Sequence, residues 1–151
     1  QEAMHGLDGI AVTLKADGGI DRIIITEDKC TDSPRGKITQ QVYPEFVEIE
    51  AGTKNNAIMQ QVAVLLSDEA LVRVQNDITN PRYRQYRIAI TRLDMHNSDD
   101  GRKTLFRDYE MKIGGPDVDR RTCSTTSFNN MRVWMDDLKQ LVIAALTRQI
   151  P

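Results

Sequence analysis

Two periodic segments in the second half of the chain restrict its fold more than any other feature. From Tyr83 to Leu93 polar and apolar side chains alternate, with Tyr86 and Ile88 on the apolar face. This period of two is typical of a half-buried β-strand. From Phe128 to Arg148 apolar side chains recur at spacings of three and four without glycine or proline, which predicts a helix. A sheet with one apolar face followed by such a helix indicates an α+β fold.

The first part of the chain is predicted to form a β-hairpin. Gly9–Leu14 and Ile20–Thr26 are rich in β-branched residues, and the turn between them contains Asp17-Gly18-Gly19. Glycine there supplies the positive φ angles that a tight turn requires. Further strands of an antiparallel sheet are expected at Ile38–Val47, Ile58–Leu66, Leu71–Ile78 and Thr104–Ile113.

The length and composition of the chain fit one domain. A chain of 151 residues with 40% hydrophobic side chains is long enough to bury a core without disulfides or metals. We expect a single domain over residues 1–151, with a hairpin region at 1–56, a main sheet at 57–113 and one or two C-terminal helices at 124–150. No apolar run approaches the roughly 20 residues that span a bilayer, so we expect no membrane partner.

Charge is distributed unevenly along the chain. Residues 1–56 carry ten acidic and six basic side chains, whereas the segment from Arg82 to Arg107 carries seven basic and three acidic ones. Arginine predominates among these seven, and its planar guanidinium matches the geometry of phosphate. A solvated sheet face would also explain this excess of basic side chains. On charge alone, the solvated face is favoured over a nucleic-acid-binding face.

The sequence shows no motif of an enzyme, a cofactor site or a metal site. It has no glycine-rich phosphate loop, no nucleophile motif and no metal-ligand spacing, and its acidic residues fall mostly in predicted turns. We therefore expect a protein that is not an enzyme and that needs no cofactor and no metal. Cys30 and Cys123 are compatible with buried thiols, with one disulfide or with contacts to other chains.

The order of elements after residue 57 resembles the coat (capsid) proteins of small single-stranded RNA bacteriophages. The resemblance is carried by the basic and aromatic run Asn80–Leu93, a polar loop, Arg107-Asp108-Tyr109 in a predicted strand, and the final amphipathic helix. It implies homodimers in which each C-terminal helix packs on the partner's sheet, and dimers that assemble into an icosahedral shell. It also implies a virion protein, assembled in the cytoplasm of the bacterial host, whose sheet binds an RNA hairpin and represses translation.

The resemblance assigns roles to three groups of residues. RNA binding is expected of Arg73, Gln75, Arg87, Thr91 and Tyr109. A dimer interface is expected of Phe128, Met131, Trp134, Met135, Leu138, Leu141 and Val142. The loop Asp94–Lys103, with Asp94, His96, Asp100, Gly101 and Arg102, corresponds to the loop at the symmetry axes of the shell.

The residues of the predicted C-terminal helix also favour a dimer, independently of the resemblance. Its apolar arc is wider than packing on one sheet would use, and obligate dimers resemble a domain core divided between two chains. A helix buried in a monomeric domain fits the pattern nearly as well.

One alternative function stays open on the residues alone. The chain starts at Gln1 rather than at methionine and contains two cysteines. These features are compatible with an extracytoplasmic α+β binding or accessory domain in which Cys30 and Cys123 form a disulfide. A disulfide would support this alternative, and its absence would weaken it.

Overall fold

The four strands form one mixed sheet in the order β1-β2-β3-β4. The computed structural model describes residues 7–31, 33–92, 96, 98–127 and 131–147. Its strands are β1 (Gly9–Leu14), β2 (Ile20–Cys30), β3 (Arg84–Arg92) and β4 (Arg121–Ser127). β1 and β2 form the predicted hairpin, whereas β3 and β4 join the sheet in parallel. The α+β class is therefore confirmed, but the prediction of an antiparallel main sheet is wrong.

Helices occupy the connection from β2 to β3, because parallel neighbours cannot be joined by a tight turn. The connection consists of α1 (Pro34–Lys37), a π-helical turn (Ile38–Val42), α2 (Tyr43–Glu50), α3 (Asn55–Leu65), α4 (Asp68–Val74) and a 3-10 turn (Pro81–Tyr83). The strands predicted at Ile38–Val47, Ile58–Leu66 and Leu71–Ile78 are therefore wrong.

A helical period is present in the first of these segments. Ile38, Val42, Phe46 and Ile49 follow one another at spacings of three or four, and all four side chains are fully buried. This stripe is the apolar face of a helix. Farther along the chain, the Ser67 side chain accepts a hydrogen bond from a backbone N–H in the first turn of α4 and so caps that helix.

The connection from β3 to β4 is helical as well. It contains α5 (Asp99–Leu105), α6 (Tyr109–Lys112) and a 3-10 turn (Val118–Arg120). The strand predicted at Thr104–Ile113 is wrong, and the predicted loop Asp94–Lys103 becomes helical at its end. The cause is a local cap, because the Gly101 N–H donates a hydrogen bond to the Ser98 side chain at 3.0 Å and starts α5.

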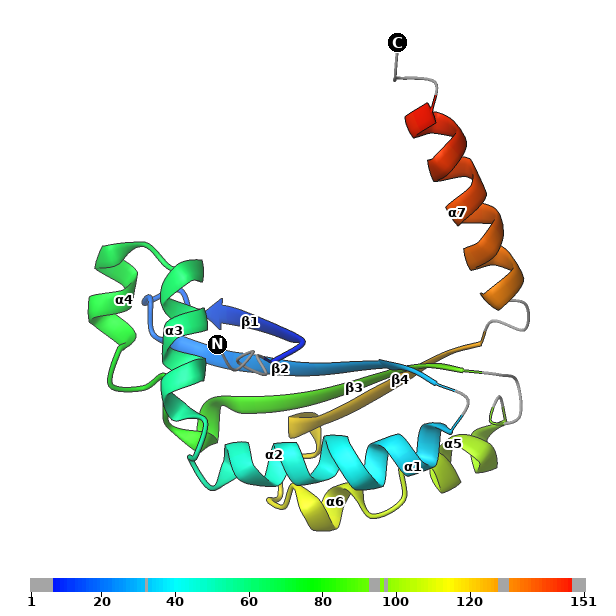
Figure 1. The fold of residues 1–151 in the computed structure, drawn as a ribbon. Coiled ribbons are helices and arrows are strands. Elements are labelled where there is room, and N and C mark those ends of the chain that lie inside the picture. Colours follow the sequence, from blue (N-terminus) through cyan, green and yellow to red (C-terminus); the bar gives the residue numbers. More distant parts are fainter. Residues whose placement is uncertain (1–6, 32, 93–95, 97, 128–130, 148–151) are drawn as a thin grey trace.

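The core lies between the sheet and the helices on one of its faces. Figure 1 shows α1, α2, α5 and α6 together on that side of the sheet. β3 contributes the side chains that its alternation predicts, including Tyr86, Ile88 and Ile90, and all three are buried. The Tyr109 hydroxyl donates a hydrogen bond to the Tyr86 carbonyl at 2.9 Å, which fixes α6 against the inner face of β3.

The last helix, α7 (Met131–Thr147), confirms the predicted C-terminal helix. The helical region was expected from residue 124, but Arg121–Ser127 form β4 instead. In Figure 1 α7 stands away from the sheet and the other helices, and its side chains from residue 133 onward are all exposed. Packing on a partner's sheet stays a prediction. Across the described ranges, no helix combines the length and apolarity that crossing a membrane requires.

Candidate active site

Charged side chains lie on the inner face of the sheet near the end of β2. Residues two apart in a strand point to the same face, so the inner face of β2 runs from Ile23 and Ile25 to Glu27 and Lys29. The two isoleucines are fully buried and Glu27 is only 1% exposed. A carboxylate and an ammonium thus occupy positions where the pattern calls for apolar side chains. Buried charges of this kind are rare unless they are paired, and they often mark functional sites.

Asp8 joins this cluster from the neighbouring strand. It precedes Gly9, which pairs with Thr26, so the antiparallel register brings Asp8 beside Glu27. The Lys29 Nζ donates hydrogen bonds to Asp8 Oδ2 at 2.6 Å and to Glu27 Oε2 at 2.7 Å. One ammonium therefore bridges two carboxylates, whose oxygens lie within two hydrogen-bond lengths of each other. We call Asp8, Glu27 and Lys29 the β2 cluster.

The β2 cluster forms part of a cavity of about 460 Å³. The remaining lining residues come from the helical segment that follows β2, and they are Gln41, Pro44, Glu45, Glu48 and Lys54. The Lys54 Nζ lies 2.6 Å from Glu45 Oε1. The lining holds four carboxylates against two ammonium groups, and this excess of negative charge favours a bound cation.

One oxygen of Glu27 has no hydrogen-bond partner. Oε2 accepts from Lys29, but Oε1 is buried and unpaired, which within the described part of the chain is true of only one other side-chain atom, Arg84 Nε. A buried polar atom without a partner costs about 1–3 kcal/mol, and more when the group is charged. Most buried polar atoms in native proteins are satisfied, so this oxygen marks the β2 cluster as a candidate ligand site.

The pKa values of the β2 cluster diverge. Burial raises the pKa of Glu27, and the hydrogen bond from Lys29 offsets only part of that effect. Burial also acts to raise the pKa of Asp8, but hydrogen bonds from Lys29 and the Asp28 backbone, with a further contribution from the neighbouring Glu27 carboxyl group, outweigh it and lower the pKa. Burial acts to lower the pKa of Lys29, but its two carboxylate partners raise it. The ammonium is therefore firmly charged, and Glu27 is the carboxyl group of the β2 cluster that holds its proton more tightly, whereas Asp8 loses its proton more readily.

The donors of the β2 cluster fit a hard divalent cation. No group of three or more His, Cys, Asp or Glu side chains in the described ranges could hold a metal ion. Mg²⁺ does not need such a group, because proteins bind it through one or two carboxylates while waters and substrate phosphates complete its shell. Asp8 and Glu27 supply the two carboxylates, and the unpaired Oε1 is a ligand atom that no protein donor occupies.

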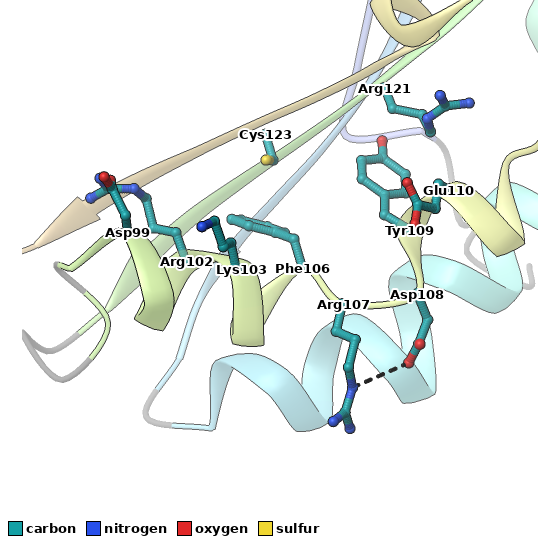
Figure 2. Close-up of a pocket in the computed structure, with 10 residues that line it drawn as sticks. All are labelled: Asp99, Arg102, Lys103, Phe106, Arg107, Asp108, Tyr109, Glu110, Arg121 and Cys123. Atoms are coloured by element: carbon teal, nitrogen blue, oxygen red, sulfur yellow. Dashed lines mark hydrogen bonds and ion pairs between the residues drawn. The ribbon is translucent and has the colours of Figure 1, made fainter. Parts of the chain in front are cut away.

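A second, larger cavity lies between α5, α6 and β4, with a volume of about 660 Å³ (Figure 2). Phe106, Tyr109 and Cys123 form its apolar part, and burial raises the pKa of the Cys123 thiol. Its charges compensate one another locally, as in the ion pair of Arg107 with Asp108 at 3.7 Å. Neither of the two buried unpaired atoms, on Glu27 and Arg84, belongs to its lining. This cavity therefore offers fewer signs of chemistry than the β2 cluster does.

The structure separates the five residues that were expected to bind RNA. Arg87 and Thr91 share the outer face of β3, opposite the core. Arg73 lies in α4 and Gln75 directly after it. Tyr109 is buried against the sheet at 6% exposure, so its predicted stacking on an RNA base does not fit this position. Arg87 and Thr91 therefore lie together on the sheet, whereas Arg73 and Gln75 lie at the end of α4 and Tyr109 lies in α6.

The other residues assigned by resemblance are also accounted for. Of the predicted symmetry-axis loop, Asp100, Gly101 and Arg102 lie in α5 rather than in a loop. Asp94 and Phe128 lie outside the described residues, and both neighbours of His96 do as well. Met131 begins α7. The remaining interface candidates are 40–69% exposed, and they are Trp134, Met135, Leu138, Leu141 and Val142. Their role in a dimer stays a prediction.

The two cysteines lie on opposite faces of the sheet. Cys30 pairs with Thr91 on the outer face, and Cys123 pairs with Ile88 on the inner face. No disulfide joins them. This arrangement weakens the alternative of an extracytoplasmic domain stabilised by a Cys30–Cys123 disulfide.

Sequence reasoning missed the whole β2 cluster. A signal was present, because the inner positions of β2 change from isoleucine to Glu27 and Lys29 without a break in the alternation. Asp8 is the residue directly before the hairpin's first strand. Two charges at apolar positions, opposite an acid on the paired strand, indicate a site rather than a turn.

Comparison of the chain with protein-family models, with curated proteins and with solved structures found no match.

Proposed function

We propose that the protein is a divalent-cation-dependent hydrolase of phosphodiester bonds, with nucleic acid as its substrate. The observation that carries the proposal is the β2 cluster, in which Lys29 bridges Asp8 and Glu27 beside a buried unpaired carboxylate oxygen. Hydrolysis of a phosphodiester needs ligands for a cation and a positive charge for the phosphate. The β2 cluster contains both kinds of group within one cavity.

Asp8 and Glu27 would hold the cation. When bound, a Mg²⁺-type cation supplies Lewis-acid stabilisation of a phosphoryl oxygen and lowers the pKa of water. Oxygen ligands favour Mg²⁺ or Mn²⁺ over softer metals. Binding would also satisfy the Oε1 atom of Glu27, which the protein alone leaves unpaired.

Lys29 serves the substrate. An ammonium has three N–H donors, and two of them bind the carboxylates of the β2 cluster. Its side chain is 24% exposed, so a phosphate in the cavity can reach it. A fixed positive charge at this position stabilises the negative charge that builds up on the phosphate in the transition state.

Water is the nucleophile in this proposal. The described residues that line the cavity include no hydroxyl, thiol or imidazole group that would attack the phosphate instead. The oxygen of the attacking water forms a bond to phosphorus while a carboxylate of the β2 cluster accepts its proton, and the P–O bond to one sugar breaks so that this sugar oxygen leaves and takes up a proton from solvent. The Asp8 side chain is 38% exposed, so the cluster is open to a polymer that lies across it, and nucleic acid is the common phosphodiester polymer.

The test is a cleavage assay on labelled single- and double-stranded DNA and RNA, with Mg²⁺, with Mn²⁺ or with EDTA. We expect cleavage with either cation and none with EDTA. Glu27→Gln should lower the rate at least about 100-fold. Asp28→Asn is the matched control, because Asp28 is the next residue of β2 and faces the other side of the sheet. Equal cleavage by the wild type and Glu27→Gln would indicate a contaminating nuclease and overturn the proposal.

The coat-protein function stays a prediction, but several of the strands on which the resemblance was based are not present in the structure. Residues 55–65 and 68–74 are helical, Thr104–Ile113 is not a strand, and the sheet is mixed. The homodimer, the icosahedral shell and the RNA hairpin as partners are likewise untested. A megadalton particle that carries RNA, detected by size-exclusion chromatography, would restore this function.

A further inference from the structure

A second lysine lines the cavity of the β2 cluster. Lys54 precedes the first residue of α3, and its Nζ lies 2.6 Å from Oε1 of Glu45 in the first turn of α2. Both side chains are about three-quarters buried. Lys54 therefore resembles Lys29, since its ammonium binds one carboxylate on the wall of the same cavity, where the ammonium of Lys29 binds two.

The Lys54–Glu45 pair acts on the β2 cluster through its charge. The Glu45 carboxylate raises the pKa of Glu27 by electrostatic repulsion, so the two carboxylates lie within electrostatic reach of each other. A partly exposed ion pair between residues nine apart contributes little to stability. The position of this ion pair on the wall of the cavity therefore suggests a role in substrate binding rather than in stability.

We propose that Lys54 binds a phosphate of the substrate next to the scissile one, and that Glu45 keeps the ammonium in the cavity until the phosphate replaces it. This inference rests on the proposed function and names a residue for substrate binding rather than for chemistry. Lysine is a common phosphate ligand because its ammonium is a compact charge with three donors. A nucleic-acid strand presents such neighbouring phosphates, whereas a small phosphodiester has none.

The test compares two substrates that differ in this one respect. The wild type, Lys54→Ala and Lys54→Arg are each assayed with Mg²⁺ on a labelled single-stranded DNA oligonucleotide and on bis(p-nitrophenyl) phosphate. We expect Lys54→Ala to raise KM for the oligonucleotide about tenfold, with kcat nearly unchanged, and Lys54→Arg to restore KM. The small ester has no neighbouring phosphate, so its KM should differ far less between the three proteins than the KM of the oligonucleotide.

Salt dependence supplies a second measurement that does not require turnover. The slope of log affinity for the oligonucleotide against log salt concentration should fall by about one unit in Lys54→Ala, because one phosphate contact is lost. Lys37→Ala is the control, since Lys37 is exposed at the end of α1 and does not line the cavity. Its salt slope should match that of the wild type.

The outcomes separate this inference from the function on which it rests. If the wild type cleaves the oligonucleotide and Lys54→Ala has the same KM and salt slope, Lys54 does not bind a phosphate and only the inference fails. If Lys54→Ala loses hydrolysis of both substrates equally, Lys54 supports the site as a whole and the inference also fails. If the wild type cleaves none of the DNA and RNA substrates with Mg²⁺ or Mn²⁺, the proposed function fails and the role of Lys54 falls with it.

Discussion

The β2 cluster and α7 depart from the usual distribution of side chains in opposite directions. Glu27 is a charged residue buried under the helices, whereas Leu141 is a large apolar residue that is 69% exposed on α7. The buried charge has partners within the chain, because Lys29 binds it directly. The exposed side chains of α7 belong to a helix that stands away from the rest of the fold in Figure 1.

The difference shows which region can be tested in a single chain. The β2 cluster contains its own counter-ion within the chain, so its proposed chemistry can be measured on the isolated protein. A lone helix of 17 residues is marginally stable in water, and exposed apolar stripes usually mark contact surfaces. The role of α7 therefore has to be measured as an association or as a change in stability.

The largest expected effect comes from removing the charge of Lys29. Lys29→Met keeps most of the side-chain volume but leaves Asp8 and Glu27 without their ammonium and the phosphate without a donor. We expect kcat for nucleic-acid cleavage to fall about 100- to 1,000-fold, as when one transition-state donor is lost. Lys37→Met, on the exposed end of α1, should cleave like the wild type. Cleavage by Lys29→Met at the wild-type rate would remove the β2 cluster from the mechanism.

The next effect concerns α7. If its stripe contacts another copy of the chain, Leu138→Asp should convert dimers into monomers in analytical ultracentrifugation, because burying one leucine contributes about 1.5–3 kcal/mol. Gln140→Asp introduces the same charge two residues away, on a different side of the helix, and should leave the dimer intact. A wild type that is monomeric at all concentrations would show that α7 does not join two copies.

A smaller effect is expected in the pH dependence of stability. The pKa of Glu27 is raised in the folded protein, so the folded state binds its proton more tightly than the unfolded state does. The free energy of unfolding should therefore fall as the pH rises from the unfolded pKa of about 4.5 through the raised pKa, by about 1.4 kcal/mol for each tenfold difference in proton affinity between the two states. Glu27→Gln should flatten this slope in urea titrations without a divalent cation. The same slope in both proteins would mean that Glu27 is not the group responsible.

The Asp8 carboxyl contributes with the opposite sign. Its pKa is lowered in the folded protein, so its contribution to stability is present above the usual value of about 3.8 and is lost as the pH falls through the lowered pKa. The two acids of the β2 cluster thus act in separate pH ranges, which allows the Glu27 slope to be measured above about pH 5.

The smallest effect is expected on the outer face of the sheet. Arg87 lies on the side of β3 opposite the β2 cluster, so Arg87→Ala should change KM for nucleic-acid cleavage less than about twofold. A large loss of RNA affinity in this variant would instead favour the RNA-binding face that the coat-protein resemblance implies. Filter binding of RNA hairpins to both proteins at low and high salt decides between the two faces.

Much of the fold could be predicted from local patterns. The hairpin, β3 and α7 follow from alternation or helical spacing, and Tyr86, Ile88 and Ile90 are buried as the alternation of β3 requires. The strands predicted between residues 58 and 78 failed because Ile, Val and Leu suit both strands and buried helices. Parallel pairing of β3 with β2 is a long-range choice that no local pattern specifies.

The site could not be predicted because the expected strand ended too early. We predicted the second strand of the hairpin only to Thr26, whereas β2 continues to Cys30. Glu, Asp and Lys have low strand propensity, so Glu27 and Lys29 appeared to begin a turn. Extending the alternation by four residues would have placed both charges on the inner face, and the hairpin register would then have added Asp8.

The bridge made by Lys29 also has a consequence for the order of binding. Because the ammonium binds both Asp8 and Glu27, an arriving cation must compete with the lysine for these carboxylates. A phosphate that draws the ammonium toward itself weakens this competition. In the proposed function, cation and nucleic acid should therefore bind cooperatively, each raising the affinity for the other by the same factor, and a cation alone should bind weakly.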